Sequence, residues 1–262
     1  MFHYFGYGSN LNAVGMRSKG VDAVSSRPAV LRDWRLAFNI NHPYAFEGKV
    51  ANIVPATGSS VHGALYVCRD ESLGPLDLFE GLDVYYERRL LNIEPYYGEP
   101  TSSYVYVGTQ AMQSDEGRPS QRYRKIIFDG GISLGIEHQY LEWIANHETY
   151  PSPNCAPFTP PDANPRLFTL QDVIGLSNYT ILAGHVFDMS VAGPHQQTLL
   201  PMLEKRDVTQ FFLQRMYSER GADSIELIER GHQNDEQNVY LNEYLHAFAH
   251  EYRYAGRLHS SD

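Results

Sequence analysis

The most restrictive feature of this sequence is its N-terminal stretch, where a strand-like run stops at a turn of small residues. Residues 2–5 (FHYF) carry the aromatic side chains that favour a strand, and residues 6–10 (GYGSN) follow at once. Glycine permits positive φ and close approach of a ligand, while Ser9 and Asn10 are good caps for a helix that we expect within residues 11–20. Such a turn is either an ordinary connection or a point where several backbone N–H groups meet, which suits a carboxylate or an oxyanion.

Proline density divides the chain. At 262 residues the chain is long for one domain and natural for two. Residues 151–165 contain six prolines, a density that excludes a helix or a central strand and predicts a stiff linker. We therefore expect a first domain over residues 1–150 and a second over residues 166–262. The hydrophobic content of 42% and the nineteen tyrosines are ample for two packed cores.

Charge and cysteine usage exclude several classes of protein. The net charge is −10, and an acidic protein of this kind repels the phosphates of a nucleic acid. No window approaches the ~20 apolar residues of a membrane span, and the N-terminus lacks the pattern of a secretion signal, so we expect a cytoplasmic protein. Cys68 and Cys155 form neither a CxxC pair nor a metal-binding pattern, and we expect no metal site.

The hydrophobic pattern of the first domain predicts mostly β-structure with a few helices. Strands are predicted over residues 27–40, 50–68 (two strands separated by TGSS) and 85–97, and residues 97–110 are predicted to form a turn and another strand. A short helix between them is predicted to end at Glu80, because Gly81 follows directly. Residues 122–131 read as a basic loop that runs into a short helix, and residues 134–147 as an amphipathic helix.

The motif FGYGSNL at residues 5–11 resembles the start of the γ-glutamylcyclotransferases and their relatives, in which it follows an N-terminal strand. Four further blocks of that family recur in the expected order: VHGALYVC, LDLFEGLDVYYERRLLNIE, SYVYVG and RPSQRYRKIIFDGGISLGIEHQYLEWI. The resemblance covers about residues 2–150. It implies an α+β domain built on a small mixed β-barrel with flanking helices.

The resemblance also implies a reaction. Enzymes of this family let the α-amine of a γ-glutamyl substrate attack the γ-carbonyl, which closes the ring of 5-oxoproline and expels an amine. Because the nucleophile is intramolecular, orientation alone reaches effective molarities of roughly 10⁵ M or more. The protein must add a base, an acid and donors for the oxyanion, and one carboxylate can be base and acid in sequence. The chemistry needs no cofactor.

By resemblance, the base and acid is Glu80, in the segment LDLFEGLDVYY. The aromatic residues Phe79, Tyr85 and Tyr86 would shield it from water, which suits a general base. Read without the family, Glu80 is an exposed acid at a helix end. The nearby carboxylates Asp77 and Glu87 are assigned to the surface.

The resemblance assigns the binding of the γ-glutamyl head to the opening loop. Its members are Tyr4, Phe5, Gly6, Tyr7, Gly8, Ser9 and Asn10, and Tyr123 of SQRYRKII contacts the substrate from across the pocket. Arg122, Arg124 and Lys125 either steer an anionic substrate or form a solvated charged face. One departure from the family lies between Gly81 and Tyr86. Asp83 and Val84 stand where a glycine often precedes the tyrosine, so we expect the turn to be built differently. The resemblance therefore indicates the type of reaction more firmly than the identity of the leaving amine.

The second domain, over about residues 165–255, resembles the cytochrome b5-like domain. FTLQDV matches the opening strand and helix of that family, YTILAGHVFDMS its central hairpin, and LLPMLEKRDVTQFF the helices that wall the haem pocket. A final helix is predicted with Leu241, Leu245, Phe248 and Tyr252 on one face. The resemblance implies a small α+β domain.

The haem ligands of that family are poorly matched here. The family's HPGG turn is approximated by GPHQQ, which retains His195, and the second ligand position falls on Tyr217. We therefore expect a module without haem that acts in interaction or dimerisation, or as a lid over the other domain. His246 and His250 have metal-ligand spacing on a helix, but a solvated polar face is favoured, because no glutamate directly follows His246.

The resulting hypothesis is a two-domain enzyme that releases 5-oxoproline from a γ-glutamyl amino acid, peptide or amine, with no nucleic-acid partner and as a candidate homodimer. The alternative is a non-catalytic haem-binding, ligand-binding or interaction protein, in which the second domain provides the function. A redox partnership through that domain is the weakest alternative, since HPGG is missing. Glutathione, a γ-glutamyl dipeptide, a γ-glutamyl polyamine and a natural-product intermediate all present the same head, so the sequence leaves the leaving amine open.

Overall fold

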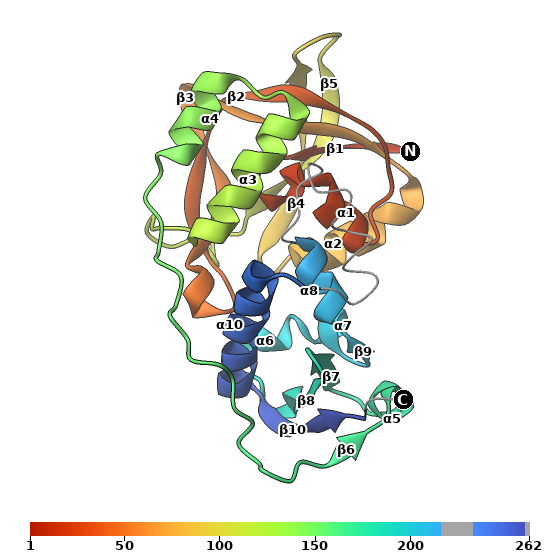
Figure 1. Ribbon diagram of the computed structural model, residues 1–262. Coiled ribbons are helices and arrows are strands. Elements are labelled where there is room, and N and C mark those ends of the chain that lie inside the picture. The colour runs from red at the N-terminus through yellow and green to blue at the C-terminus, as the bar shows by residue number, and fades with distance from the viewer. Residues whose placement is uncertain (216–232, 260–262) are drawn as a thin grey trace. The chain divides into compact units, whose positions relative to one another are not determined.

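The computed structural model describes residues 1–215 and 233–259 (Figure 1). The chain divides into two compact units, whose main segments are residues 1–152 and residues 153–214 with 233–259; Arg215 groups with the first unit. Residues 151–165 contain neither helix nor strand, as their proline content predicts. Among the described residues, no helix is long and apolar enough to span a lipid bilayer.

The core of the first unit is a closed barrel of five strands, so the predicted mixed β-barrel is confirmed. Its strands are β1 (Phe2–Gly6), β2 (Ala23–Asn41), β3 (Lys49–Cys68), β4 (Tyr86–Pro95) and β5 (Thr101–Gly108). Their order around the barrel is β1, β3, β2, β4, β5. The barrel closes where β1 pairs in parallel with β5, at Tyr4 and Tyr104, whereas the other neighbours are antiparallel.

Strand β3 is longer than the sequence pattern predicts. The pattern predicts two strands within residues 50–68, but β3 runs for 20 residues and pairs with β2 along most of its length. The TGSS segment lies inside β3, next to a register shift between the pairs Arg32–Ser60 and Trp34–Pro55. An irregularity of this kind bends a strand without ending it, which is why turn-forming residues are tolerated there.

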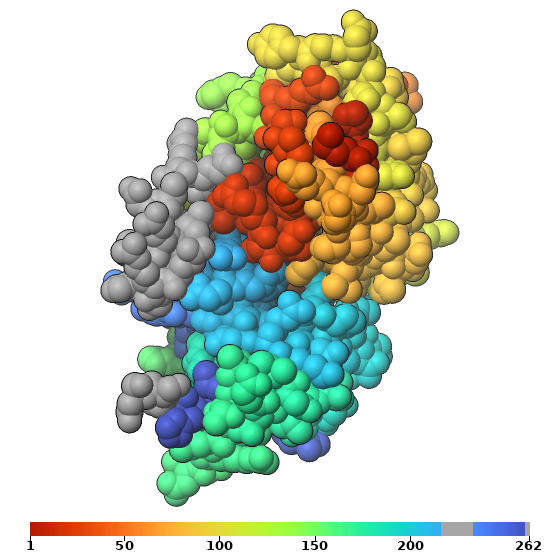
Figure 2. All heavy atoms as spheres, turned by 90° about the vertical axis from the view of Figure 1, so that its right-hand side faces the viewer, coloured from red at the N-terminus to blue at the C-terminus, as the bar shows by residue number. Residues whose placement is uncertain are grey.

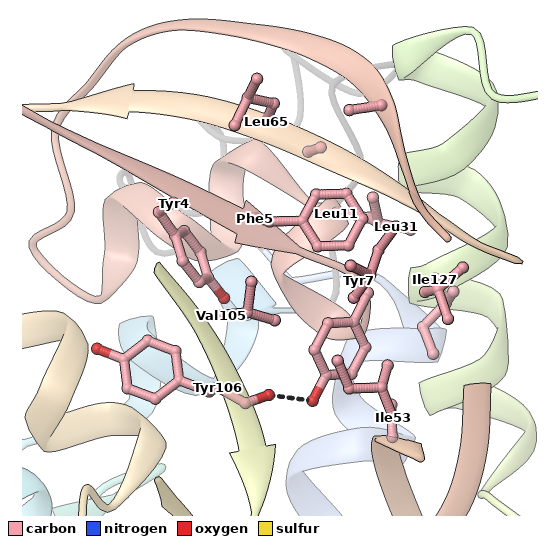
Figure 3. Close-up of a cluster of buried hydrophobic side chains, with 14 of the residues drawn as sticks. Tyr4, Phe5, Tyr7, Leu11, Leu31, Ile53, Leu65, Val105, Tyr106 and Ile127 are labelled. Carbon is pink, nitrogen blue, oxygen red and sulfur yellow. Dashed lines mark hydrogen bonds between the residues drawn. The ribbon is translucent and has the colours of Figure 1, made fainter. Parts of the chain in front are cut away.

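Helices α3 (Gln121–Leu134) and α4 (His138–Ala145) pack beside the barrel (Figure 1). The predicted basic loop at the start of residues 122–131 is wrong, because these residues are helical from Gln121 onward; the short helix predicted after the loop is present as part of α3. Ser120 caps this helix, since its hydroxyl accepts a hydrogen bond from the Tyr123 N–H over 3.0 Å. On the inner face of α3, Ile127 is fully buried in the same core as Phe5 (Figure 3).

Short helices join the strands of the first unit. They are η1 (Ser9–Leu11), α1 (Ala13–Ser18), η2 (Ala45–Glu47), η3 (Asp70–Ser72) and α2 (Leu73–Glu80). Figure 2 shows the segment of α1 and the segment of α2 side by side on one face of this unit. The two are tied where the Asp22 N–H, just after α1, donates to Ser72 Oγ over 2.8 Å. The chain after the opening loop is thereby held against the helix that ends at Glu80.

The second unit contains a sheet of five strands in the order β6, β10, β8, β7, β9. The strands are β6 (Leu167–Phe168), β7 (Tyr179–Leu182), β8 (His185–Asp188), β9 (Arg206–Asp207) and β10 (Arg253–Leu258). The predicted hairpin is present, since β7 and β8 pair in antiparallel fashion. The predicted opening strand and helix are present as β6 and α5 (Leu170–Gly175).

Helices and aromatic side chains fill the remainder of the second unit. Besides α5, the helices are η4 (Met189–Val191), α6 (Pro194–Gln197), α7 (Leu200–Leu203), α8 (Thr209–Arg215) and α10 (Asp235–Glu251). The Phe248 ring lies 5.5 Å from that of Phe187 and 5.8 Å from that of Phe212, centroid to centroid. The predicted apolar face of the last helix is confirmed for Leu241, Leu245 and Phe248, which are all buried. Tyr252 is buried too, but it lies just after α10 in an extended conformation.

Candidate functional site

The opening loop begins where β1 ends, and it contains one turn more than the sequence predicts. After Gly6 the chain forms η1, and only then does α1 begin. The predicted caps Ser9 and Asn10 are therefore wrong. Asn12 is the cap, because its Oδ1 accepts from the Val14 N–H at 3.0 Å and the Gly15 N–H at 3.3 Å. The extra turn leaves the Asn10 side chain to make other contacts.

Glu80 lies at the end of α2, as the sequence predicts. Gly81 follows with φ of 58°, in the left-handed conformation that ends helices. The next turn contains a second left-handed residue, because Asp83 has φ of 64° and its N–H donates to the Tyr86 carbonyl over 2.8 Å. Asp83 thus adopts a backbone conformation that glycine takes without strain, which is how the turn forms without a glycine there.

The two segments meet at a cavity of about 30 Å³. Its lining residues are Tyr4, Tyr7, Gly8, Ser9, Asn10, Ala51, Glu80, Tyr86, Tyr106 and Tyr123. The structure therefore brings Glu80 together with most of the loop residues named from the sequence, and with Tyr123 from α3. Strands β1, β3, β4 and β5 each contribute at least one side chain or backbone segment.

Phe5 and Gly6, two of the loop residues named from the sequence, do not line this cavity. Strand alternation turns the Phe5 side chain to the other face of β1 from Tyr4, and it is fully buried in the barrel core (Figure 3). Gly6 acts through its lack of a side chain. A Cβ there would lie 3.1 Å from the Asn10 Cβ, so glycine allows the loop to fold back over the end of β1.

Asn10 is the centre of a hydrogen-bond network beside the cavity. Its Nδ2 donates to Glu80 Oε1 over 2.8 Å and to the Tyr4 hydroxyl over 2.5 Å. Its Oδ1 accepts from the Lys19 ammonium over 2.6 Å. The Lys19 Nζ also lies 3.5 Å from Glu80 Oε1. The Glu80 side chain is 14% exposed, so this carboxylate is largely shielded from water.

Five tyrosines surround the carboxylate, and all remain neutral at physiological pH. Burial is the largest cause that raises the pKa of each phenol, and the negative charge of Glu80 raises each pKa further; the five are Tyr4, Tyr7, Tyr86, Tyr106 and Tyr123. Tyr7 donates to the Tyr106 carbonyl over 2.5 Å (Figure 3), and Tyr86 donates to the Ala51 carbonyl over 2.7 Å. These phenols act as hydroxyl donors and acceptors rather than as bases.

Asp77 is part of the support of this cavity, so its predicted place at the surface is wrong. The Tyr106 hydroxyl donates to Asp77 Oδ1 over 2.5 Å, and Arg88 Nη1 donates to both Asp77 oxygens at 2.6 and 2.5 Å. The side chains of Asp77 and Arg88 are only 22% and 25% exposed. Glu87 lies at the surface, as predicted, where it pairs with Arg89.

The basic residues of α3 do not form a charged loop over the site. Arg122 donates to Glu47 Oε1 over 2.8 Å, Arg124 donates to the carbonyls of Ala145 and His147, and Lys125 pairs with Asp129 on the same helix. None of the three lines the cavity. Their contacts are those of residues that stabilise the fold.

Sequence reasoning misses Lys19, Ala51 and Tyr106. Tyr106 has a detectable signal, because Tyr104 and Tyr106 alternate with valine in SYVYVG and so share one face of β5. Lys19 and Ala51 have none, since a lysine after a helix and an alanine in a strand are ordinary residues. Tyr86 is recognised from sequence only as a source of shielding, whereas its hydroxyl contacts the backbone at the cavity wall.

The predicted metal and haem ligands do not converge in the part of the chain that the structure describes. Residues 1–215 and 233–259 contain no cluster of three or more metal-binding side chains. His195 lies in α6 with an exposed side chain, and Tyr217 is outside the described residues. His246 Nε2 lies 2.9 Å from the Ala156 carbonyl, and His250 is 84% exposed beside Glu251.

Comparison with known proteins bears on the first unit. Residues 4–125 match the model of the family described as gamma-glutamyl cyclotransferase, AIG2-like. A comparison with curated protein sequences finds no match.

Solved structures share the fold of this unit. One described as gamma-glutamyl cyclotransferase is 23% identical, with a TM-score of 0.52 over 61% of this chain and 94% of that one. An uncharacterized human protein, loc79017, is 24% identical with a TM-score of 0.51 over 61% of this chain and 94% of its own. YkqA from Bacillus subtilis is 21% identical with a TM-score of 0.50 over 56% of this chain and 55% of its own. Together, the sequence match and the shared fold support the gamma-glutamyl cyclotransferase, AIG2-like family for residues 4–125 of this chain.

Proposed function

We propose that the first unit is a γ-glutamyl cyclotransferase, which releases 5-oxoproline and an amine from a γ-glutamyl amino acid, peptide or amine. The observation that carries this proposal is the position of Glu80, a shielded carboxylate at the wall of a cavity that the opening loop and five tyrosines also line. The family match over residues 4–125 supports the same class of reaction. Substrate binding is assigned to Tyr4, Tyr7, Gly8, Ser9, Asn10 and Tyr123.

In the first step Glu80 acts as the base. The α-ammonium of the substrate gives a proton to the carboxylate, and the amine then attacks the γ-carbonyl carbon, which forms the C–N bond of the five-membered ring. Asn10 and Lys19 both approach Oε1 of Glu80, so we assign the proton transfer to Oε2. Holding one oxygen fixed orients the other, and orientation is the main demand of an intramolecular reaction.

The ring closure places negative charge on the former carbonyl oxygen. Tyr4 is suited to stabilise it, because its oxygen accepts from Asn10 and its own O–H can be donated. The backbone N–H groups of residues 8–10 are further candidates for this role. The intermediate then collapses as the bond to the leaving amine breaks. Glu80 gives its proton to that amine, then takes the remaining extra proton from the ring nitrogen and passes it to the same amine, which departs as an ammonium ion. One carboxylate thereby serves as base and then as acid.

The cavity is smaller than its proposed substrate. A volume of about 30 Å³ has room for one or two water molecules, so a γ-glutamyl head enters by displacing side chains at the wall. The leaving amine would extend beyond it. The turn at Asp83 lies next to Glu80 in sequence and is unlike the family pattern, so it is a candidate contact for that amine.

The test is release of 5-oxoproline from γ-glutamyl amino acids, γ-glutamyl amines and glutathione, measured for the wild type and Glu80→Gln. Glutamine keeps the shape of the side chain but cannot take the proton, so we expect kcat to fall about 10²- to 10⁴-fold. The matched control is Glu87→Gln, an exposed glutamate paired with Arg89, which should leave the rate unchanged. Full activity in Glu80→Gln would refute the assignment of the base, and a silent wild type across the panel would refute the reaction.

We also propose that the second unit is a cytochrome b5-like module that does not hold haem and acts through contacts with a partner. The β7–β8 hairpin and the β6–α5 opening support the resemblance. An iron ligand must project into a shielded pocket, whereas His195 is exposed on a helix of four residues.

Titration of the full-length protein with hemin tests the haem proposal. We expect the absorption spectrum to be the same for the wild type and His195→Ala, with no shift of the Soret band beyond that of free hemin. A shifted Soret band that His195→Ala abolishes would show instead that this module retains its cofactor.

A further inference from the structure

Lys19 is a buried cation whose place in the site no sequence motif indicates. It follows α1 directly, as the residue that ends the helix. Its side chain is 10% exposed and reaches back to the opening loop, where Nζ lies 2.6 Å from Asn10 Oδ1 and 3.5 Å from Glu80 Oε1. The Phe79 ring lies beneath it, with Nζ 6.0 Å from the ring centroid. Lys19 does not line the cavity, so it would not touch a substrate there.

The chemistry of its partners fixes the orientation of the Asn10 amide. An ammonium group only donates hydrogen bonds, and a carboxylate only accepts them. With Oδ1 toward Lys19 and Nδ2 toward Glu80, both contacts of Asn10 are favourable. A flipped amide would place its oxygen against the Glu80 carboxylate and its NH₂ group against the ammonium, so that both contacts would be repulsive. Lys19 therefore selects the orientation that lets Asn10 hold Glu80 and Tyr4 together.

The charge of Lys19 also acts on Glu80 directly. Burial lowers the pKa of Lys19 and the negative charge of Glu80 raises it, so each charge stabilises the other. Arg215, which groups with the first unit, lowers the pKa of Lys19 through its own positive charge. The other titratable side chains that interact with Glu80 are phenols with raised pKa values: Tyr4, Tyr7, Tyr86, Tyr106 and Tyr123. Neutral phenols cannot replace the charge of Lys19.

We propose that Lys19 is a positioning residue for the general base: it orients the Asn10 amide, which holds the Glu80 carboxylate in place, without contacting the substrate. This inference rests on the proposed function, in which Glu80 is the base. The role has two parts, which are the hydrogen bond to Asn10 Oδ1 and the positive charge beside Glu80 Oε1.

Three variants of Lys19 test this role through kcat and KM for the release of 5-oxoproline. Lys19→Met removes the charge and the donor, so we expect kcat to fall about tenfold with little change of KM, because Asn10 loses its orientation while the contacts to the substrate remain. Lys19→Gln keeps a donor for Asn10 Oδ1, so it should recover most of kcat. Lys19→Arg keeps both the donor and the charge and should resemble the wild type. The matched control is Lys125→Met, which removes an exposed lysine paired with Asp129.

A second readout does not depend on turnover. In protein labelled with nitrogen-15, the Asn10 side-chain amide signals are assigned by NMR as those that Asn10→Ala removes. We expect these signals to shift in Lys19→Met and to stay near their wild-type positions in Lys19→Arg, because arginine keeps the donor for Asn10 Oδ1. If the wild type released no 5-oxoproline, this result would still establish the effect of Lys19 on Asn10, so failure of the proposed function and failure of the inference are distinguishable.

Two results would overturn the inference. A Lys19→Met variant with the wild-type kcat and unchanged Asn10 amide signals would show that Lys19 does not orient this amide. A Lys19→Arg variant that is as impaired as Lys19→Met, while both unfold at the wild-type temperature, would show that Lys19 acts by its shape alone.

Discussion

The two units of this chain place their polar side chains differently. In the first unit, Asn10, Lys19 and Glu80 are drawn into contact beside a cavity, although they come from segments about seventy residues apart. In the second unit, aromatic rings fill the core, and the histidines that the sequence singles out lie elsewhere. His195 and His250 are exposed, and His246 contacts the backbone of the linker.

This difference shows what can be inferred from a sequence resemblance. In the first unit the resemblance rests on residues that the fold then brings to one site, such as the Gly8–Ser9–Asn10 turn and Glu80. In the second unit it rests on strand and helix patterns, such as the β7–β8 hairpin, which specify packing without chemistry. The first kind of resemblance predicts a reaction, and the second predicts only an architecture.

The largest expected effect comes from the core of the second unit. Phe248→Ala removes a fully buried ring that packs against Phe187 and Phe212, so we expect that unit to lose about 3–5 kcal/mol of unfolding free energy. The rings of Phe187 and Phe212 belong to the second unit, and we expect release of 5-oxoproline by the first unit to persist. Chemical denaturation followed by circular dichroism, with activity measured at each denaturant concentration, checks both statements.

The matched control is Val239→Ala, which shortens an exposed side chain on the same helix and should change the unfolding free energy by less than about 0.5 kcal/mol. If Phe248→Ala abolished activity before the barrel unfolded, the comparison of the two units would break, because the second would then be needed for the chemistry of the first.

Much of the first unit can be predicted from sequence, because its signals are local. The helix that ends at Glu80 is predictable because Gly81 is a local stop signal. The strand before the opening loop is predictable because aromatic residues precede glycines there. The cap at Asn12 is missed because three residues of η1 intervene, and no pattern distinguishes an added turn of 3₁₀ helix from the start of α1.

The rest of the site depends on contacts between distant segments. Tyr106 and Asp77 share a hydrogen bond because the fold brings β5 of the barrel next to helix α2, and the sequence around neither residue indicates this contact. Lys19 is the clearest case, since a lysine after a helix is normally solvated. Only the packing of its segment against α2 buries it beside Glu80.

A smaller loss of stability is expected in the first unit, at Gly130 in α3, and it allows the two units to be compared. A Cβ at this position would lie 2.7 Å from the backbone carbon and oxygen of Leu11, so the helix packs directly on the last residue of η1. Gly130→Ala must push the two apart, and we expect a loss of about 1–3 kcal/mol of unfolding free energy. Because η1 carries Ser9 and Asn10, the same shift should also slow the release of 5-oxoproline.

The control is Gly74→Ala in α2, where nothing lies within 4 Å of the added Cβ and stability should be kept or slightly raised. A Gly130→Ala variant that lost stability but kept its full rate would show that the opening loop tolerates displacement, and that the site depends on its hydrogen bonds to Glu80 more than on the packing of α3.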